Sequence, residues 1–412
     1  MNSFLKTSLS KNILILISLT FFNWSCVKEE VKIRFWHFWS EPKQAKVIKE
    51  IVAEFEKIHK CKVEISELSW NDGKTKLILA FNSRTAPDVI ELGSDWVSQF
   101  SSAQVLEELS ETEFQTGKYF NYSLEPGKYK NKIYAIPWIV ATRVLFCNLE
   151  LMEKSGIPTP PKTLDELLFF SSKINDDGFG YGFGANGTDP HRLYKKILPL
   201  IWTFGGEIVD SNGNIVINNY YTIKSFDYYF KLSRTGIIET QKQIDLLFVQ
   251  GKVAFCFSGE WLLDLITQSN ADLHFTTSLI PGVDGKPGIS FAGGEYLAIN
   301  KNSKNKELAK TFIKFLLSDK NVIKLCREIP SAGFPADTLN FKNPELIINN
   351  HKKTFAEQLK YSKMTPVHPR WIEIEAIIEK ALEEVIYQKK DIQEALKDAQ
   401  KEIDIYNRNI SF

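Results

Sequence analysis

The stretch "VKIRFWHFWSEP", residues 31–42, decides the fold because it joins a strand directly to a helix. Residues 31–38 show no clean alternation of apolar and polar side chains, which is typical of a parallel strand covered on both faces. Pro42 fits the first turn of a helix. Apolar residues then follow at helical spacing: Ile48, Ile51, Val52 and Phe55.

Two further strands are predicted, "CKVEISEL" at 61–68 and "APDVIELG" at 86–93. Strands that alternate with helices predict an open α/β sheet, and such sheets bind ligands beyond the carboxyl ends of their strands. The rings within the first strand are expected in the sheet: Phe35, Trp36 and Phe38. The residues that follow it are expected at the ligand-binding edge: Trp39, Ser40 and Glu41.

The middle of the chain, about residues 148–288, predicts a second lobe. Thr163 is placed to cap a helix that follows a run of prolines. The segment "DDGFGYGFGANG" at 176–187 is expected to be a glycine-rich turn region, and "WTFGGEIVDSNGNIVIN" at 202–218 a hairpin with Asn-Gly at its tip.

The last third returns to a strand at 289–303 and then to helices. The helix at 305–320 is expected to turn four residues inward: Leu308, Phe312, Phe315 and Leu316. Two final apolar stripes predict two more helices: Ile374, Ile377, Ile378, Ala381 and Val385, then Ile392, Ala395, Leu396, Ala399 and Ile403. Asp391 and Glu394 are spaced as a capping pair for the last helix.

Charge and composition exclude several classes of function. The 412 residues carry 51 Lys and Arg against 50 Asp and Glu, so net charge gives no reason to expect nucleic acid binding. The length suits two domains of roughly 150 to 200 residues. Wide cysteine spacing predicts no structural metal site, and we favour no disulfide among the four later cysteines: Cys61, Cys147, Cys256 and Cys326.

The N-terminus predicts export. Lys6 and Lys11 precede an apolar run from Ile13 to Phe22, which is shorter than the roughly 20 residues that a membrane-spanning helix needs. Ser25 and Cys26 resemble the cleavage and lipidation site of bacterial lipoproteins, which implies a signal peptide of residues 1–25 and a lipid on Cys26. A plain signal peptide with a different cleavage site is the alternative.

Five stretches in this order resemble the family 1 extracellular solute-binding proteins of ABC importers, which include maltodextrin-binding receptors. They are "APDVIELGSDWVSQF", "IYAIPWIVATRVLFCNLELMEKSGIPTPPKTLDEL", "FVQGKVAFCFSGEW", "AGGEYLAINKNSKNKELAKTFIKFLLSDK" and "EALKDAQKEI". The resemblance implies the two-lobed α/β fold of type II periplasmic binding proteins. Lobe one would hold residues 31–137 and 292–329, and lobe two 138–291 and 330–412. Hinge crossovers would fall near "PWIVAT", "SFAGG" and "SAGFP".

A sugar needs flat rings for its apolar faces and polar groups for its hydroxyls. Strand ends supply these residue types, and the resemblance points to Asp95, Trp261 and Trp371 in particular, with Trp202 in lobe two. The full set of candidates is Trp39, Ser40, Glu41, Asp95, Trp96, Trp138, Trp202, Glu260, Trp261, Gly293, Gly294, Glu295, Arg370 and Trp371. Each has a structural alternative: the rings as core, Asp95 as a helix cap, Arg370 as a surface ion pair, the two glycines as hinge turns.

The resemblance implies capture of a mono- to oligosaccharide between the lobes and delivery to a membrane permease, by a monomer anchored through its lipid, without cofactor or metal. Ala141 and Leu92 replace an acid and a ring found in some maltodextrin-binding members, so a long maltodextrin is less expected. A glycerol phosphate, near Arg370 and Arg143, or a polyamine are alternative solutes. A secreted glycosidase is the alternative from another class, because two carboxyls facing one bond cannot be read from sequence.

Overall fold

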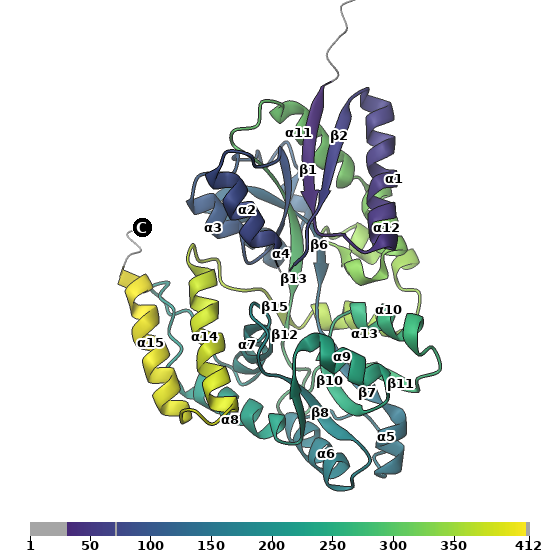
Figure 1. Cartoon of the computed structure of the whole chain (residues 1–412), viewed down its shortest axis with the longest axis vertical. Coiled ribbons are helices and arrows are strands. Elements are labelled where there is room, and N and C mark those ends of the chain that lie inside the picture. Colours follow the sequence, from purple (N-terminus) through teal and green to yellow (C-terminus); the bar gives the residue numbers. More distant parts are fainter. Residues whose placement is uncertain (1–30, 71, 409–412) are drawn as a thin grey trace, which may run out of the picture.

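The chain folds into two lobes, one above the other in Figure 1, each built around its own sheet. The structure is a computed structural model that describes residues 31–70 and 72–408. The upper lobe holds the sheet β14 (Phe334–Pro335), β6 (Ala135–Ala141), β13 (Gly293–Ile299), β3 (Val89–Gly93), β1 (Lys32–His37) and β2 (Lys62–Glu67). The lower lobe holds β11 (Phe275–Ser278), β7 (Val144–Asn148), β10 (Val253–Ser258), β8 (Tyr181–Asn186) and β9 (Gly236–Glu239).

Helices cover both sheets (Figure 1). They are α1 (Pro42–His59), α2 (Gly73–Asn82), α3 (Val97–Ser102), α4 (Asn121–Leu124), α5 (Leu149–Lys154), α6 (Leu164–Asp176), α7 (Tyr194–Thr203), α8 (Tyr220–Ser233), α9 (Gln241–Val249), α10 (Trp261–Ser269), α11 (Lys306–Leu316), α12 (Asp319–Glu328), α13 (Asn350–Leu359), α14 (Trp371–Ile386) and α15 (Ile392–Arg408). Two short pairs complete the strands: β4 (Lys128–Tyr129) with β5 (Lys132–Ile133), and β12 (Ser290–Phe291) with β15 (Ser362–Lys363).

The predicted start of the fold is confirmed. β1 pairs in parallel with β2 and β3, so the carboxyl ends of all three strands point towards the lower lobe (Figure 1). Helix α1 begins at Pro42 and buries the predicted apolar stripe. The expected cover on both faces of β1 is wrong in part, because Trp36 is only half-buried whereas Phe35 packs edge-on against Phe312 of α11.

The glycine-rich segment at 176–187 is a turn region only at residues 177–180, so this prediction was wrong for most of the segment. Residues Tyr181–Asn186 form β8, which lies between β10 and β9 in the sheet. A Cβ at Gly182 would overlap the Ser171 carbonyl of α6, and one at Gly184 would lie 2.6 Å from Ile244 of α9. The glycines therefore let helices approach a central strand closely.

Other local predictions are confirmed. Thr163 caps α6 by accepting a hydrogen bond of 3.0 Å from the Glu166 amide, and Asp391 accepts one of 2.8 Å from the Glu394 amide. Val209 and Ile215 pair across the predicted hairpin. The predicted stripes of α14 and α15 are buried, except that Ile392 is only partly buried.

The buried face of α11 is rotated by part of a turn from the predicted one. Phe312 and Leu316 are buried as predicted, but Leu308 and Phe315 are only partly buried. Ala309 and Ile313 take those places because the face against the sheet is centred on them.

Three chain segments join the two sheets. The chain leaves the upper sheet after Ala141, where β6 ends, and enters the lower sheet at Val144. It returns between β11 and β13, and leaves again after β14. The upper lobe extends further along the chain than predicted. β6 continues to Ala141, beyond the expected end at residue 137, and β14 pairs with β6 although it lies beyond the expected end at residue 329. Among residues 31–70 and 72–408, no helix combines the length and apolar composition needed to cross a membrane.

We predict that Gly182→Ala lowers the free energy of unfolding by about 3 kcal/mol, because the new methyl overpacks the contact between β8 and α6. Urea denaturation followed by circular dichroism measures this. Gly117→Ala is the matched control, since open space surrounds Gly117, and it is expected to change the value by less than about 0.5 kcal/mol. An equally small change for both variants would contradict the packing account.

Candidate functional site

Asp95 forms a direct contact between the lobes. It follows β3 in the upper lobe, and its Oδ2 accepts a hydrogen bond of 2.9 Å from the Tyr194 hydroxyl. The Lys195 ammonium lies 3.5 Å from the same oxygen, and both partners start α7 in the lower lobe. Burial raises the pKa of Asp95, but the Lys195 charge and the Tyr194 hydrogen bond outweigh it, so the pKa lies below its usual value.

Aromatic rings extend this contact. The Tyr194 ring meets the Trp371 ring edge-on at 5.6 Å and the Phe291 ring at 6.0 Å between centroids. The Arg143 guanidinium lies 4.8 Å from the Phe291 ring and 5.3 Å from the Trp261 ring. Cation–π attraction holds the guanidinium between these two rings.

Glu295, in β13, completes the group, because its carboxyl interacts electrostatically with Arg143, Lys195 and Asp95. We call this group the junction cluster. Its members are Asp95, Arg143, Tyr194, Lys195, Trp261, Phe291, Glu295 and Trp371. They come from strand ends, helix starts and the segments that join the sheets.

Two charged members, Arg143 and Glu295, are half-buried and are incompletely paired within the described chain. The Arg143 guanidinium makes no hydrogen bond or ion pair with any residue of the described chain, and burial lowers its pKa to about 10. The Glu295 Oε2 atom is buried without a partner in that same part of the chain, and burial raises the pKa of Glu295 to about 7. A buried polar atom without a partner costs free energy, so the Glu295 Oε2 atom favours a bound donor such as a hydroxyl, and the half-buried Arg143 guanidinium has donors free for the same molecule.

Buried indole N–H groups are further unused donors. Within the described chain, four buried indole nitrogens have no acceptor: those of Trp39, Trp96, Trp138 and Trp371. The Trp39 and Trp138 rings meet edge-on at 6.5 Å. Of these four, the Trp371 donor belongs to the junction cluster, as the unused Glu295 oxygen does.

Trp261 is held in place by its own nitrogen. Its Nε1 donates a hydrogen bond of 2.8 Å to Asp245, which also accepts one of 2.9 Å from Ser258. The edge of the indole is thus fixed in the lower lobe, and its face lies against Arg143.

Other candidates have structural partners. Glu260 forms a buried ion pair with Lys352, which also donates to the carbonyls of Pro330 and Gly333 at 2.9 and 3.0 Å. Trp202 lies in the core of the lower lobe, outside the junction cluster.

Two more candidates lie at helix starts. Arg370 is exposed and pairs with Glu373 at 3.1 Å. Ser40 and Glu41 are exposed at the start of α1, where the Glu41 amide donates to Gln44 at 3.4 Å. Arg370 thus forms the surface ion pair that was its structural alternative. Glu41 caps the start of α1.

The two crossover glycines allow close packing. A Cβ at Gly294 would press on the Ile139 carbonyl of β6, and one at Gly293 would lie 3.6 Å from the Arg143 guanidinium. A side chain at Gly293 would therefore press on the Phe291 ring, 3.0 Å away, and only touch the guanidinium.

Sequence reasoning missed several residues near the site. Tyr194, Lys195 and Phe291 carry no local signal, since a helix start and a two-residue strand do not indicate a neighbour in the other lobe. Trp70 follows β2 as Trp39 follows β1. The rule that binding residues lie just after strands, which we call the strand-end rule, therefore applies to Trp70 too. Its ring is 40% exposed and stacks on Phe38 at 4.2 Å.

Lys74 is a missed cation of the upper lobe. It is buried near Glu375 and Asp95, and burial lowers its pKa. Within residues 31–70 and 72–408, no three His, Cys, Asp or Glu side chains are arranged to hold a metal ion.

Comparison with known proteins gives consistent matches. Residues 39–323 match the family described as "Bacterial extracellular solute-binding protein". The galactooligosaccharide-binding protein of Bacillus subtilis (strain 168) is 29% identical over 382 residues, which cover 88% of this chain and 86% of that protein. The maltodextrin-binding protein MdxE of the same organism is 24% identical, covering 88% and 87%.

The fold matches solved structures over most of the chain. The GacH receptor of Streptomyces glaucescens, described unliganded and with acarbose, has a TM-score of 0.80 at 21% identity and covers 92% of this chain and 98% of its own. Maltose-bound MalE3 of T. maritima has a TM-score of 0.80 at 22% identity, covering 91% and 100%. Both are two-lobed proteins, so the predicted fold class is confirmed.

We predict that Glu295→Gln weakens the pH dependence of stability. The raised pKa of about 7 means that the folded chain holds this proton more tightly than the unfolded chain. The contribution is therefore fully present below about pH 4.5 and is lost as the pH rises through about 7, with a slope of up to about 1.4 kcal/mol per pH unit.

Urea denaturation of wild type and Glu295→Gln between pH 4 and 8 measures that slope. The exposed Asp284 provides the control variant Asp284→Asn, which is expected to keep the wild-type slope. Equal slopes in wild type and Glu295→Gln would rule out a raised pKa at Glu295.

Proposed function

Because the chain belongs to the family of bacterial extracellular solute-binding proteins, we propose that it captures a mono- or oligosaccharide between its two lobes. The captured sugar is presented to the permease of an ABC importer. Export is in keeping with this family. The signal peptide of residues 1–25 and the lipid on Cys26 remain part of the proposal, and both lie outside the described residues.

One observation carries the sugar proposal. The lobe junction gathers unused hydrogen-bond donors and acceptors beside aromatic rings, with Arg143 and the Trp371 indole as donors and Glu295 as an acceptor. A sugar hydroxyl both donates and accepts, and the C–H faces of a sugar ring pack on aromatic rings. A purely apolar ligand would leave these groups unpaired.

Binding would act through the relative position of the lobes. Asp95 and Glu295 belong to the upper lobe, whereas Tyr194, Lys195 and Trp261 belong to the lower one. A sugar that contacts both groups stabilises the closed arrangement by its higher affinity for it. The three crossovers that join the sheets would serve as the hinge.

The energetics suffice for a receptor. A hydrogen bond to a charged group contributes about 1.5 to 3 kcal/mol, so two or three of them with stacked rings reach the roughly 8 kcal/mol of micromolar affinity. Arg143, Lys195 and Lys74 place three cations at or near the site, which disfavours a polyamine. The Bacillus subtilis relative makes galactooligosaccharides the first sugars to test.

We expect Trp261→Ala to weaken sugar binding at least about tenfold, because it removes a ring face and the contact that holds Arg143. A thermal-shift screen of mono- and disaccharides, galactooligosaccharides, glycerol phosphates and polyamines identifies the solute, and calorimetry then compares the variants. Tyr220→Ala, which removes a ring that is 68% exposed on α8, should bind as wild type does.

Three results would contradict the proposal. Unchanged affinity in Trp261→Ala would remove this ring from the site. Stabilisation by polyamines alone would exclude a sugar receptor, and chromatography that shows hydrolysis of the bound sugar would favour a glycosidase.

A further inference from the structure

A cavity lies at the far end of the upper lobe from the junction cluster (Figure 1). It measures about 360 Å³ and opens beside the start of β1, at Lys32 and Arg34. Its other walls come from the loop before β3 and the loop between β13 and α11. Because β1 and β3 are parallel, the carboxyl edge of their sheet faces the lower lobe and this cavity lies at the amino edge.

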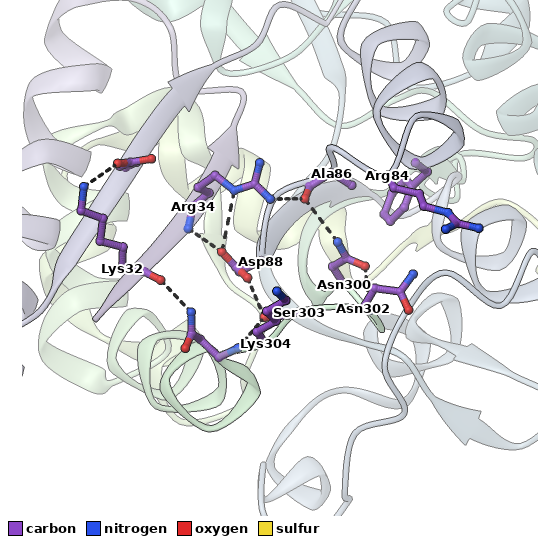
Figure 2. A pocket seen from close by; sticks show the side chains of 12 residues that line it. Lys32, Arg34, Arg84, Ala86, Asp88, Asn300, Asn302, Ser303 and Lys304 are labelled. Carbon is purple, nitrogen blue, oxygen red and sulfur yellow. Dashed lines mark hydrogen bonds and ion pairs between the residues drawn. The ribbon is translucent and has the colours of Figure 1, made fainter. Parts of the chain in front are cut away.

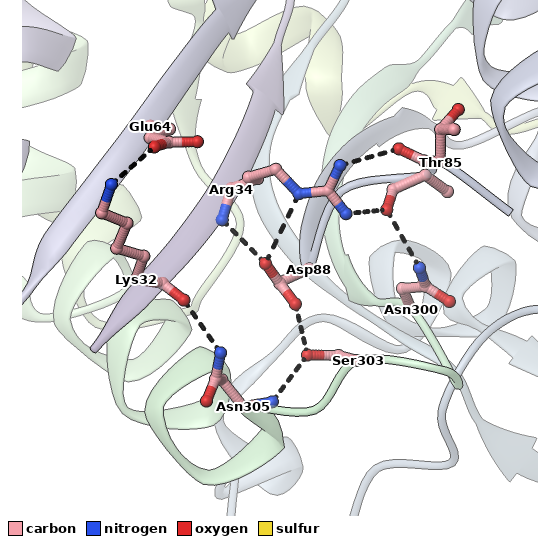
Figure 3. Close-up of polar contacts among 9 residues, drawn as sticks. Lys32, Arg34, Glu64, Thr85, Asp88, Asn300, Ser303 and Asn305 are labelled. Carbon is pink, nitrogen blue, oxygen red and sulfur yellow. Dashed lines mark hydrogen bonds and ion pairs between the residues drawn. The ribbon is translucent and has the colours of Figure 1, made fainter. Parts of the chain in front are cut away.

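Hydrogen bonds between separate segments hold the cavity in shape (Figure 3). Arg34 donates to the carbonyls of Thr85 and Ala86 at 2.9 and 2.7 Å. The Asp88 carboxylate accepts a hydrogen bond of 2.8 Å from the Arg34 amide and one of 2.6 Å from the Ser303 hydroxyl. Arg34 and Asp88 are therefore occupied by hydrogen bonds within the protein, and these bonds hold the segments that form the cavity walls together.

The cavity walls carry a surplus of positive charge. Four cationic side chains and two carboxylates line them, a formal charge of +2 on a chain whose total is only +1. Arg84 and Lys304 are exposed and make no side-chain hydrogen bond or ion pair with any other described residue, so their donors are free to bind a ligand. Figure 2 shows Arg84 and Lys32 on opposite sides of the cavity, with Arg34 and Asp88 between them.

We propose that this cavity binds a phosphate group, held by Arg84 and Lys304 and by the side-chain amide of Asn302, whose backbone amide already donates to Asn300. Arginine and lysine are the side chains that recognise phosphate, and amide N–H groups complete such sites. Asn305, the N-cap residue of α11, lies in the cavity wall, and its side chain caps none of the first-turn amides, so the positive end of the helix dipole favours an anion there. The volume leaves room for a small organic group attached to the phosphate.

The phosphate has two chemically equivalent sources. One is a free phosphate or a soluble phosphate ester. The other is the headgroup of an anionic phospholipid, because Cys26 lies five residues before Val31 and that length of chain spans at most about 18 Å. The test has one arm for each source.

The first arm measures the melting temperature of the full chain in inorganic phosphate, against sodium chloride of equal ionic strength. We expect saturable stabilisation, and about tenfold weaker binding in Arg84→Ala with Lys304→Ala. The second arm measures co-sedimentation of the full chain carrying Cys26→Ser with phosphatidylglycerol or phosphatidylcholine vesicles. The Cys26→Ser change removes the proposed lipid, so binding then depends on the protein alone.

Arg234→Ala with Lys286→Ala is the matched control, since it removes the same charges from exposed positions of the lower lobe. We call the Arg84→Ala, Lys304→Ala double variant the pocket variant. If only the pocket variant loses binding of inorganic phosphate, the natural ligand is a soluble phosphate compound. If only the pocket variant loses binding to phosphatidylglycerol vesicles, the natural ligand is a lipid headgroup. No binding in either arm, or equal losses in both double variants, would overturn the proposal. Unchanged sugar binding in the pocket variant would show that it is folded and that this site is separate from the junction cluster.

Discussion

The Asp95 carboxylate lies buried at the lobe junction, and it stays charged there because Tyr194 and Lys195 reach it from the opposite lobe. Taking a charge out of water is costly unless partners replace its hydration. This requirement links the end of β3 to the start of α7, two elements that belong to different sheets. The arrangement of the two lobes around the junction cluster follows from it.

The same requirement supports the proposal that the cluster binds a sugar. Asp95 has its partners, whereas Arg143 and the Glu295 Oε2 atom lack them within the described chain. The unpaired groups lie at the segments that join the sheets, where a ligand can contact both lobes at once. Binding energy gained there is available to stabilise one arrangement of the lobes over another.

The sequence predicted the strands and helices of the upper lobe well, because hydrophobic spacing is a local signal. It failed at β8, where glycines that usually mark turns instead let α6 approach the strand. The strand-end rule pointed to Asp95 and Trp261, which lie in the junction cluster, and equally to Glu260, which pairs with Lys352. Such a rule locates the edge of a sheet but not the neighbour that each side chain meets.

The upper sheet presents different chemistry at its two edges. Rings and carboxylates gather at the carboxyl edge, near Trp39 and Asp95, whereas unpaired cations gather at the amino edge, near Arg84 and Lys304. A crystal structure with the solute bound tests the central claim most directly. The account predicts electron density for a sugar between the lobes, with hydroxyls within hydrogen-bond distance of Arg143 and Glu295. A sugar bound elsewhere, with both groups still unpaired, would contradict it.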